Sequence, residues 1–162
     1  MTKKTVYLLL ALALPGLTFL FLKFFGKNHF DIPVYYKEGV PVESIECSKD
    51  FHGQYILPDS VLRILGCKPD VACLFVDASK KNDKDVLQLK HSFSENQLQI
   101  VSLEGIEPDR LNHLKNCSLF LKYPWMAVLV DKEKRIRGYY AFTNLEETDR
   151  LKVEVEILLT NN

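Results

Sequence analysis

Hydrophobic positions form one continuous segment near the start of the chain and shorter, spaced groups beyond it. The continuous segment, Val6 to Leu22, contains about 17 residues and no charged side chain. Roughly 20 apolar residues are typical of a helix that crosses a bilayer, so this segment is near the short end of that class. Pro15 and Gly16 interrupt it, which a membrane helix tolerates when neighbouring groups satisfy the backbone. The pattern predicts one N-terminal transmembrane helix within a membrane anchor over residues 1–25.

The flanking charges predict the orientation of this anchor. Lys3 and Lys4 precede the apolar segment, which favours a cytoplasmic N-terminus and a C-terminal domain on the periplasmic or extracytoplasmic side. Lys23 and Lys27 lie on the far side and act against that orientation. A cleaved signal peptide is the alternative, because residues 11–13 (Ala-Leu-Ala) have the small-x-small pattern of a cleavage site. Apolar residues continue well past that point, so we favour a retained, single-pass anchor.

Beyond a juxtamembrane linker and extended segment over residues 26–53, the pattern alternates between strands and helices. The apolar run at 71–76 fits a strand that is buried on both faces. Val86, Leu89 and Phe93 recur on one helical face within residues 82–94. The other expected elements are a strand at 54–57, a helical turn at 61–66, a strand at 97–103, a helix with Pro108 in its first turn, a hairpin of strands at 125–130 and 136–142, and a last helix after Asn144.

This order of elements predicts an α/β fold. A β-α-β unit followed by a β-β-α unit is the pattern of a thioredoxin-like domain, with a central mixed sheet flanked by helices. We assign that domain to residues 54–162. Trp125 stands at the start of an expected strand, so we predict that it belongs to the core.

Charge excludes one class of partner. The whole chain has 21 basic and 21 acidic residues, but the first 27 residues carry four lysines and no acid. The remainder therefore has 17 basic and 21 acidic residues, a net charge of −4. Phosphate backbones require clustered positive charge, so we expect no nucleic-acid partner.

Three stretches resemble a known family, the Sco/SenC proteins. These are membrane-anchored, thioredoxin-fold proteins that deliver copper during cytochrome c oxidase assembly. The resemblance implies the same scaffold here, and a periplasmic or membrane protein as partner alongside the membrane lipid. The similar stretches are residues 28–36 (Asn-His-Phe-Asp-Ile-Pro-Val-Tyr-Tyr), residues 55–59 (Tyr-Ile-Leu-Pro-Asp), and residues 128–140 (Val-Leu-Val-Asp-Lys-Glu-Lys-Arg-Ile-Arg-Gly-Tyr-Tyr) with Glu147, Arg150 and Leu151.

The resemblance fails where that family binds copper. Its Cys-x-x-x-Cys motif follows the first central strand, and those two positions hold Ser79 and Asp83 here. The position of its histidine ligand holds Tyr123. Serine and aspartate are hard ligands and do not replace thiolates for Cu(I), and serine cannot form the disulfide that thiol exchange requires. We therefore expect no catalytic, cofactor-binding or metal-binding residue, and a non-catalytic binding or assembly module, in respiratory-complex (cytochrome c oxidase) biogenesis by resemblance.

The alternative is a copper-binding protein or thiol oxidoreductase that uses relocated cysteines. Cys47 with His52, or Cys67 with Cys73, would supply soft ligands for copper. Cys67 and Cys73 close a short loop and could instead form a structural disulfide. We favour a buried free thiol for Cys73, because a cysteine in a buried strand behaves as a small hydrophobe. Cys47 and Cys117 could also pair, and sequence alone leaves the connectivity open.

Lysines gather around the start of the helix expected at 82–94. We interpret this group as a solvated helix start, which is the usual role of a charge run. An anion-binding helix N-terminus is the alternative, since exposed backbone N–H groups favour one. The group consists of Lys80, Lys81, Lys84 and Lys90.

Overall fold

The structure, a computed structural model, describes residues 3–25, 31–40, 47 and 53–160. The chain divides into two compact units, Met1–Asp31 and Ile32–Asn162. Both hydrophobic core clusters and both disulfides belong to the second unit. That unit is called the domain below.

The first unit is a single helix, α1 (Lys3–Phe25), of 23 residues, which continues through Pro15. Large apolar side chains are exposed on it, among them Leu17, Phe19 and Leu20. The predicted transmembrane helix is not found, because no helix among the described residues is both long enough and apolar enough to cross a membrane.

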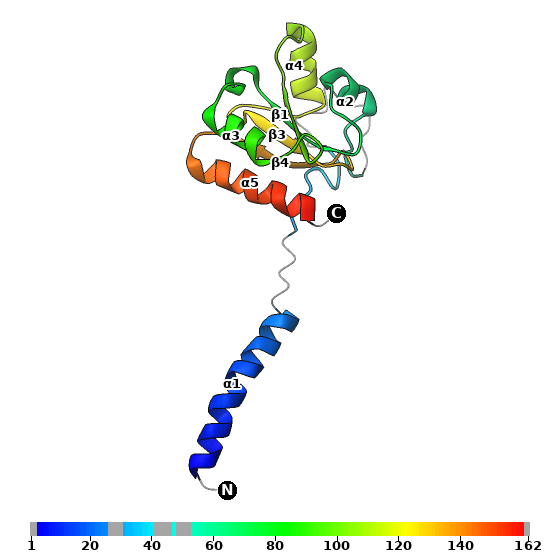
Figure 1. Cartoon of the computed structure of the whole chain (residues 1–162). Coiled ribbons are helices and arrows are strands. Elements are labelled where there is room, and N and C mark those ends of the chain that lie inside the picture. The colour runs from blue at the N-terminus through cyan, green and yellow to red at the C-terminus, as the bar shows by residue number, and fades with distance from the viewer. Residues whose placement is uncertain (1–2, 26–30, 41–46, 48–52, 161–162) are drawn as a thin grey trace. The chain divides into compact units, whose positions relative to one another are not determined.

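The domain contains a four-stranded sheet with helices on both faces (Figure 1). The predicted α/β class with a central mixed sheet is therefore confirmed. The described elements of the domain are α2 (Asp59–Leu65), β1 (Ala72–Val76), the 3₁₀ turn η2 (Ala78–Lys80), α3 (Lys84–Ser92), β2 (Leu98–Ser102), α4 (Pro108–Cys117), β3 (Ala127–Val130), β4 (Ile136–Tyr140) and α5 (Leu145–Thr160).

The sheet has the order β2-β1-β3-β4. β1 pairs in parallel with β2 and antiparallel with β3, and β3 pairs antiparallel with β4. A parallel pair requires a crossover, and α3 lies between β1 and β2 in the chain. β1 is central and all five of its residues are buried, as its continuous apolar run predicts.

Helices cover both faces of the sheet (Figure 1). α3 and α5 pack on one face, where Leu89 and Leu151 contact the same cluster as Leu74 of β1. α2 and α4 pack on the other face, where Leu62 and Leu114 join Phe75 of β1. Successive side chains of a strand point to opposite faces, so the apolar run of β1 supplies both clusters.

Residues 32–40 belong to the domain, although they were predicted to lie in the linker and extended segment. Ile32 is buried. The Tyr35 N–H donates to the Ile136 carbonyl at 2.9 Å, and the Tyr36 carbonyl accepts from the Tyr55 N–H at 2.9 Å. The strand expected at 54–57 does not form, because the backbone there makes single hydrogen bonds to different segments instead of a ladder.

Buried tyrosines fix the segment that leads from α4 towards β3. The Tyr139 hydroxyl donates to the Leu119 carbonyl at 2.8 Å, and the Tyr55 hydroxyl donates to the Ser118 carbonyl at 2.9 Å. Burial raises the pKa of both phenols well above the ordinary value, so both stay neutral donors at physiological pH. These hydrogen bonds fix the path of the chain after α4.

Candidate functional site

The site lies at the end of the sheet where β1 finishes and β3 begins. The Asp77 N–H, just after β1, donates to the Met126 carbonyl, just before β3, at 2.8 Å. A small cavity of about 220 Å³ opens between these segments and the last turn of α4. Its lining consists of Asp77, Ser79, Lys115, Leu121, Tyr123, Trp125 and Met126.

Asp77 organises the polar side of this cavity. Its Oδ1 atom accepts from the Ser79 backbone N–H at 3.0 Å and from Ser79 Oγ at 2.8 Å. Its Oδ2 atom accepts from Nζ of Lys115 on α4. Burial disfavours the charged carboxylate, but the hydrogen bonds from Lys115 and Ser79 outweigh burial and hold the pKa of Asp77 below its ordinary value. Asp77 is therefore a charged anchor that joins η2 to α4.

This arrangement does not activate Ser79 as a nucleophile. A serine hydroxyl becomes nucleophilic when a neighbouring base removes its proton. The partner of Ser79 is a carboxylate with a lowered pKa, which is a poor proton acceptor near neutral pH. The geometry fits a structural role for Ser79, which closes the turn after β1.

Replacing Lys115 with methionine should raise the pKa of Asp77, because burial remains while the strongest favourable hydrogen bond is lost. A carboxyl group whose pKa is lower in the folded state than in the unfolded state stabilises the fold at pH values above its unfolded pKa. That stabilisation is lost as the pH falls through the folded-state pKa. We therefore expect the variant to be less stable by about 1 kcal/mol at pH 7, with the difference disappearing as the pH falls through the lowered pKa of Asp77. Urea unfolding across pH 2–7 measures this. A difference that grew towards low pH would contradict it.

Asp83 has a different structural role from Ser79. It caps α3, where its carboxylate accepts from the Asp85 N–H at 3.1 Å and from Lys80 Nζ at 2.8 Å. The hydrogen bond from Lys80 holds the pKa of Asp83 below its ordinary value. Asp83 does not line the cavity that contains Ser79 and Tyr123. Ser79 and Tyr123, two of the three positions that the resemblance aligns with copper ligands, thus line one cavity, and Asp83, the third, caps a helix.

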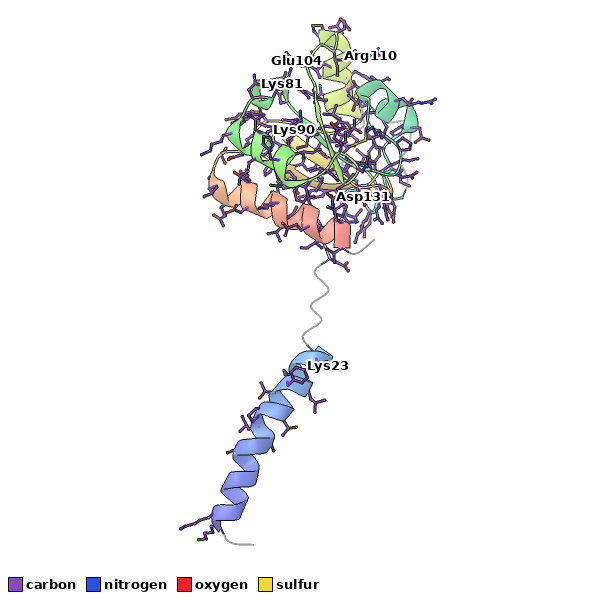
Figure 2. The ribbon with its side chains drawn as sticks, in the orientation of Figure 1. Lys23, Lys81, Lys90, Glu104, Arg110 and Asp131 are labelled. Carbon is purple, nitrogen blue, oxygen red and sulfur yellow. A yellow bond between two sulfur atoms is a disulfide. The ribbon has the colours of Figure 1, made fainter. Side chains whose placement is uncertain are left out.

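Two of the four lysines near α3 pair with acids. Lys80 pairs with Asp83. Lys81 pairs with Glu104, and both are labelled in Figure 2. The negative Asp83 already occupies the N-cap of α3, so the helix start is a less favourable place for an added anion. These contacts favour the interpretation of a solvated, ion-paired helix start.

Tyr123 and Trp125 form the apolar rim of the cavity. The Tyr123–Pro124 peptide bond is cis. The side chain of Tyr123 is 88% exposed, and that of Trp125 is 38% exposed. The prediction that Trp125 belongs to the core is wrong, because β3 begins two residues later, at Ala127, and Trp125 precedes the buried part of the strand.

All four cysteines are in disulfides. Cys47 pairs with Cys117, and Cys67 pairs with Cys73. The favoured prediction of a free thiol at Cys73 is therefore wrong. Gly66 ends α2 in the left-handed conformation (φ 73°) and turns the chain back, which brings the Cα atoms of Cys67 and Cys73 within 6.4 Å.

The relocated-cysteine alternative depends on reduction of these bonds. Thiolates bind metals, and in this form no sulfur of the chain is a thiolate. His52, the predicted imidazole partner of Cys47, lies outside the described residues. Among the residues that are described, no three His, Cys, Asp or Glu side chains gather closely enough to hold a metal ion.

No known family model, curated protein or solved structure matches this chain. The case for its function therefore depends on the residues of the site themselves. Sequence reasoning named Ser79 and Tyr123 only as positions where the resemblance implies missing copper ligands, and it missed Asp77, Lys115 and the exposure of Trp125. A signal for Asp77 was present, because a charged residue directly after a buried strand often lies at a functional edge of a sheet.

Proposed function

We propose that this protein is a membrane-bound, non-catalytic binding or assembly module with a Sco/SenC-like thioredoxin fold. Its protein partner would bind at the loop of Tyr123, Pro124 and Trp125. One observation carries the proposal most. Ser79 and Asp77 are fully engaged in local hydrogen bonds, while the aromatic side chains beside them are exposed.

The topology supports the fold assignment. A parallel β1–β2 pair with a helical crossover is extended on the β1 side by an antiparallel β3–β4 hairpin and a final helix. That is the order expected when a β-α-β unit is followed by a β-β-α unit in one sheet. The hairpin also contains most of residues 128–140, the longest stretch that resembles Sco/SenC proteins.

The disulfides and α1 support the location. Disulfides persist in oxidising compartments, so two of them favour an extracytoplasmic domain. Large apolar side chains are exposed on neighbouring positions of α1, including Phe19 and Leu20. Exposed apolar side chains at neighbouring positions favour contact with an apolar environment, which a bilayer supplies. We expect α1 to remain with the membrane pellet after carbonate extraction.

The exposed rim supports a protein partner. Tyrosine and tryptophan are enriched among the residues that carry most of the binding energy at interfaces. They bury a large apolar area and still offer a polar tip. The cavity beside them, with its Asp77–Lys115 ion pair, would receive a polar group of the partner. A respiratory-complex component is the partner class that the resemblance implies.

Site-specific cross-linking tests this surface. A photoreactive p-benzoylphenylalanine at position 123 should give one discrete adduct with a membrane or periplasmic protein in native cells. The same group at Lys90, an exposed position on α3, is the matched control and should give none. Trp125→Ala should reduce the adduct at position 123 by about fivefold or more, since truncating such a residue costs roughly 1 kcal/mol of binding or more. Equal labelling at both positions would contradict the proposed surface.

Copper binding tests the non-catalytic part separately. In a competition with a Cu(I) chelator, the domain should bind Cu(I) only weakly, because its site offers oxygen ligands. One tight equivalent per oxidised chain would overturn the proposal. If tight binding appeared only after reduction and was lost in Cys67→Ala, the relocated-cysteine alternative would be correct.

A further inference from the structure

A second cavity lies at the opposite end of the sheet, where β1 begins and β3 ends. It measures about 460 Å³ and is bounded by α2, the loop between α2 and β1, and the β3–β4 turn. Its floor is apolar, formed by Leu62, Cys67, Val71 and Val130. Its volume falls in the range of roughly 300–1,000 Å³ that small-molecule sites occupy.

The rim of this cavity carries unbalanced positive charge. Two of its three carboxylates are neutralised by neighbours. Asp131 pairs with arginines outside the lining, and Asp59 pairs with Lys134 at 2.6 Å. The rim then retains three cations, Arg63, Lys68 and Lys132, against the single carboxylate of Asp70.

The contacts of these cations leave them available. Nε of Arg63 donates to the Asp59 carbonyl at 3.4 Å, a long hydrogen bond. Lys68 lies 3.8 Å from Glu95, and both side chains are more than half exposed, so that pair is weak. Lys132 is exposed at the turn. A ligand anion could therefore recruit these side chains with little loss of existing contacts.

The wall of the cavity is held in place before any ligand binds. The Cys67–Cys73 disulfide closes the loop that forms it. Gln99 of β2 clamps the same loop twice, because its Oε1 accepts from the Lys68 N–H at 2.9 Å and its Nε2 donates to the Gly66 carbonyl at 2.8 Å. A preorganised wall lowers the entropy cost of binding.

We propose that this cavity binds a small amphiphilic anion, a phosphate monoester or carboxylate with a short apolar group. The phosphate or carboxylate group would contact the side chains of Arg63, Lys68 and Lys132, and the apolar group would pack on Leu62 and Val130. The inference is independent of the proposed function, because the two cavities share no residue. The ligand would be either a soluble molecule or the headgroup of an anionic lipid.

The test uses the full chain in phosphatidylcholine nanodiscs and isothermal titration calorimetry, with empty nanodiscs as the blank. The probes are hexyl phosphate, hexanol and hexylammonium, which share the apolar group and differ in charge. Hexyl phosphate should bind at least about tenfold more tightly than hexanol, because charge-assisted hydrogen bonds are the strong ones. Hexylammonium should bind most weakly. Equal affinity for the three probes would overturn the proposal.

Charge reversal locates the site. Arg63→Glu with Lys132→Glu should remove the preference for hexyl phosphate, while Lys90→Glu on α3 should keep it (Figure 2). Both positions of the double variant are exposed, and an unchanged near-ultraviolet circular dichroism spectrum shows that the domain is folded. An unchanged preference in the folded double variant would refute the site. Repeating the titration with phosphatidic acid in the nanodiscs identifies the source. Loss of hexyl phosphate binding indicates a lipid headgroup, and retained binding indicates a soluble anion.

Discussion

Replacing Cys47 and Cys117 together with alanine is expected to lower the free energy of unfolding of the domain by about 4 kcal/mol. The two cysteines are 70 residues apart in the sequence, with Cα atoms 4.9 Å apart. In the chain-entropy model, a cross-link over a loop of that length removes much of the conformational freedom of the unfolded state. Urea unfolding of residues 32–162, followed by circular dichroism, measures the difference between this variant and the wild type.

Reduction provides the control for this prediction. In tris(2-carboxyethyl)phosphine the wild type also lacks the cross-link, so the variant and the wild type should unfold at nearly the same urea concentration. A large difference that persisted under reduction would show that the alanines act through lost packing instead. No difference in oxidising buffer would show that the bond does not form in the protein.

The expected size of this effect matters for the location of the protein. A domain that depends on a disulfide for several kcal/mol has lost a large part of its stability margin when reduced, since native domains are stable by only about 5–15 kcal/mol. Such a domain is suited to an oxidising compartment. A disulfide contribution of the expected size would be consistent with the extracytoplasmic location that we propose.

Local patterns were sufficient to predict most of the elements. The continuous apolar run at 71–76 predicts a central strand, and β1 is central and fully buried. Val86 and Leu89 are spaced for one helical face, and both are buried in α3. These predictions succeeded because the burial of a strand or an amphipathic helix is reflected in the hydrophobic pattern of consecutive residues.

Features set by distant contacts could not be predicted in the same way. Tryptophan is a residue type that is common in strands, but the exposure of Trp125 depends on where β3 begins to pair. The Asp77–Lys115 ion pair joins residues 38 apart, and its formation depends on how α4 packs on the sheet. Ser79 and Tyr123 line the same cavity because β3 runs antiparallel beside β1, with Ala127 opposite Val76. The candidate site is thus a product of topology, which the local pattern does not encode.

The largest effect expected from a single substitution is at Asp131, in the β3–β4 turn (Figure 2). Its carboxylate is 2% exposed and accepts from Arg135 Nε at 2.8 Å and Arg137 Nη1 at 3.2 Å. Arg137 also donates to the Ile32 carbonyl at 2.7 Å, so this cluster joins the turn to the start of the domain. Asp131→Asn should lower the free energy of unfolding by about 3 kcal/mol, because it leaves a buried guanidinium without its counter-charge.

Two comparisons separate this explanation from a general loss of turn structure. Asp59→Asn removes a carboxylate from an exposed ion pair, in which Asp59 is 66% exposed, and should leave the urea unfolding curve nearly unchanged. Combining Asp131→Asn with Arg137→Met removes both buried charges, so the double variant should be more stable than Asp131→Asn alone. If the double variant were instead less stable by the sum of the two single effects, the two charges would not be coupled. The buried ion pair would then not be what holds Ile32 and the turn together.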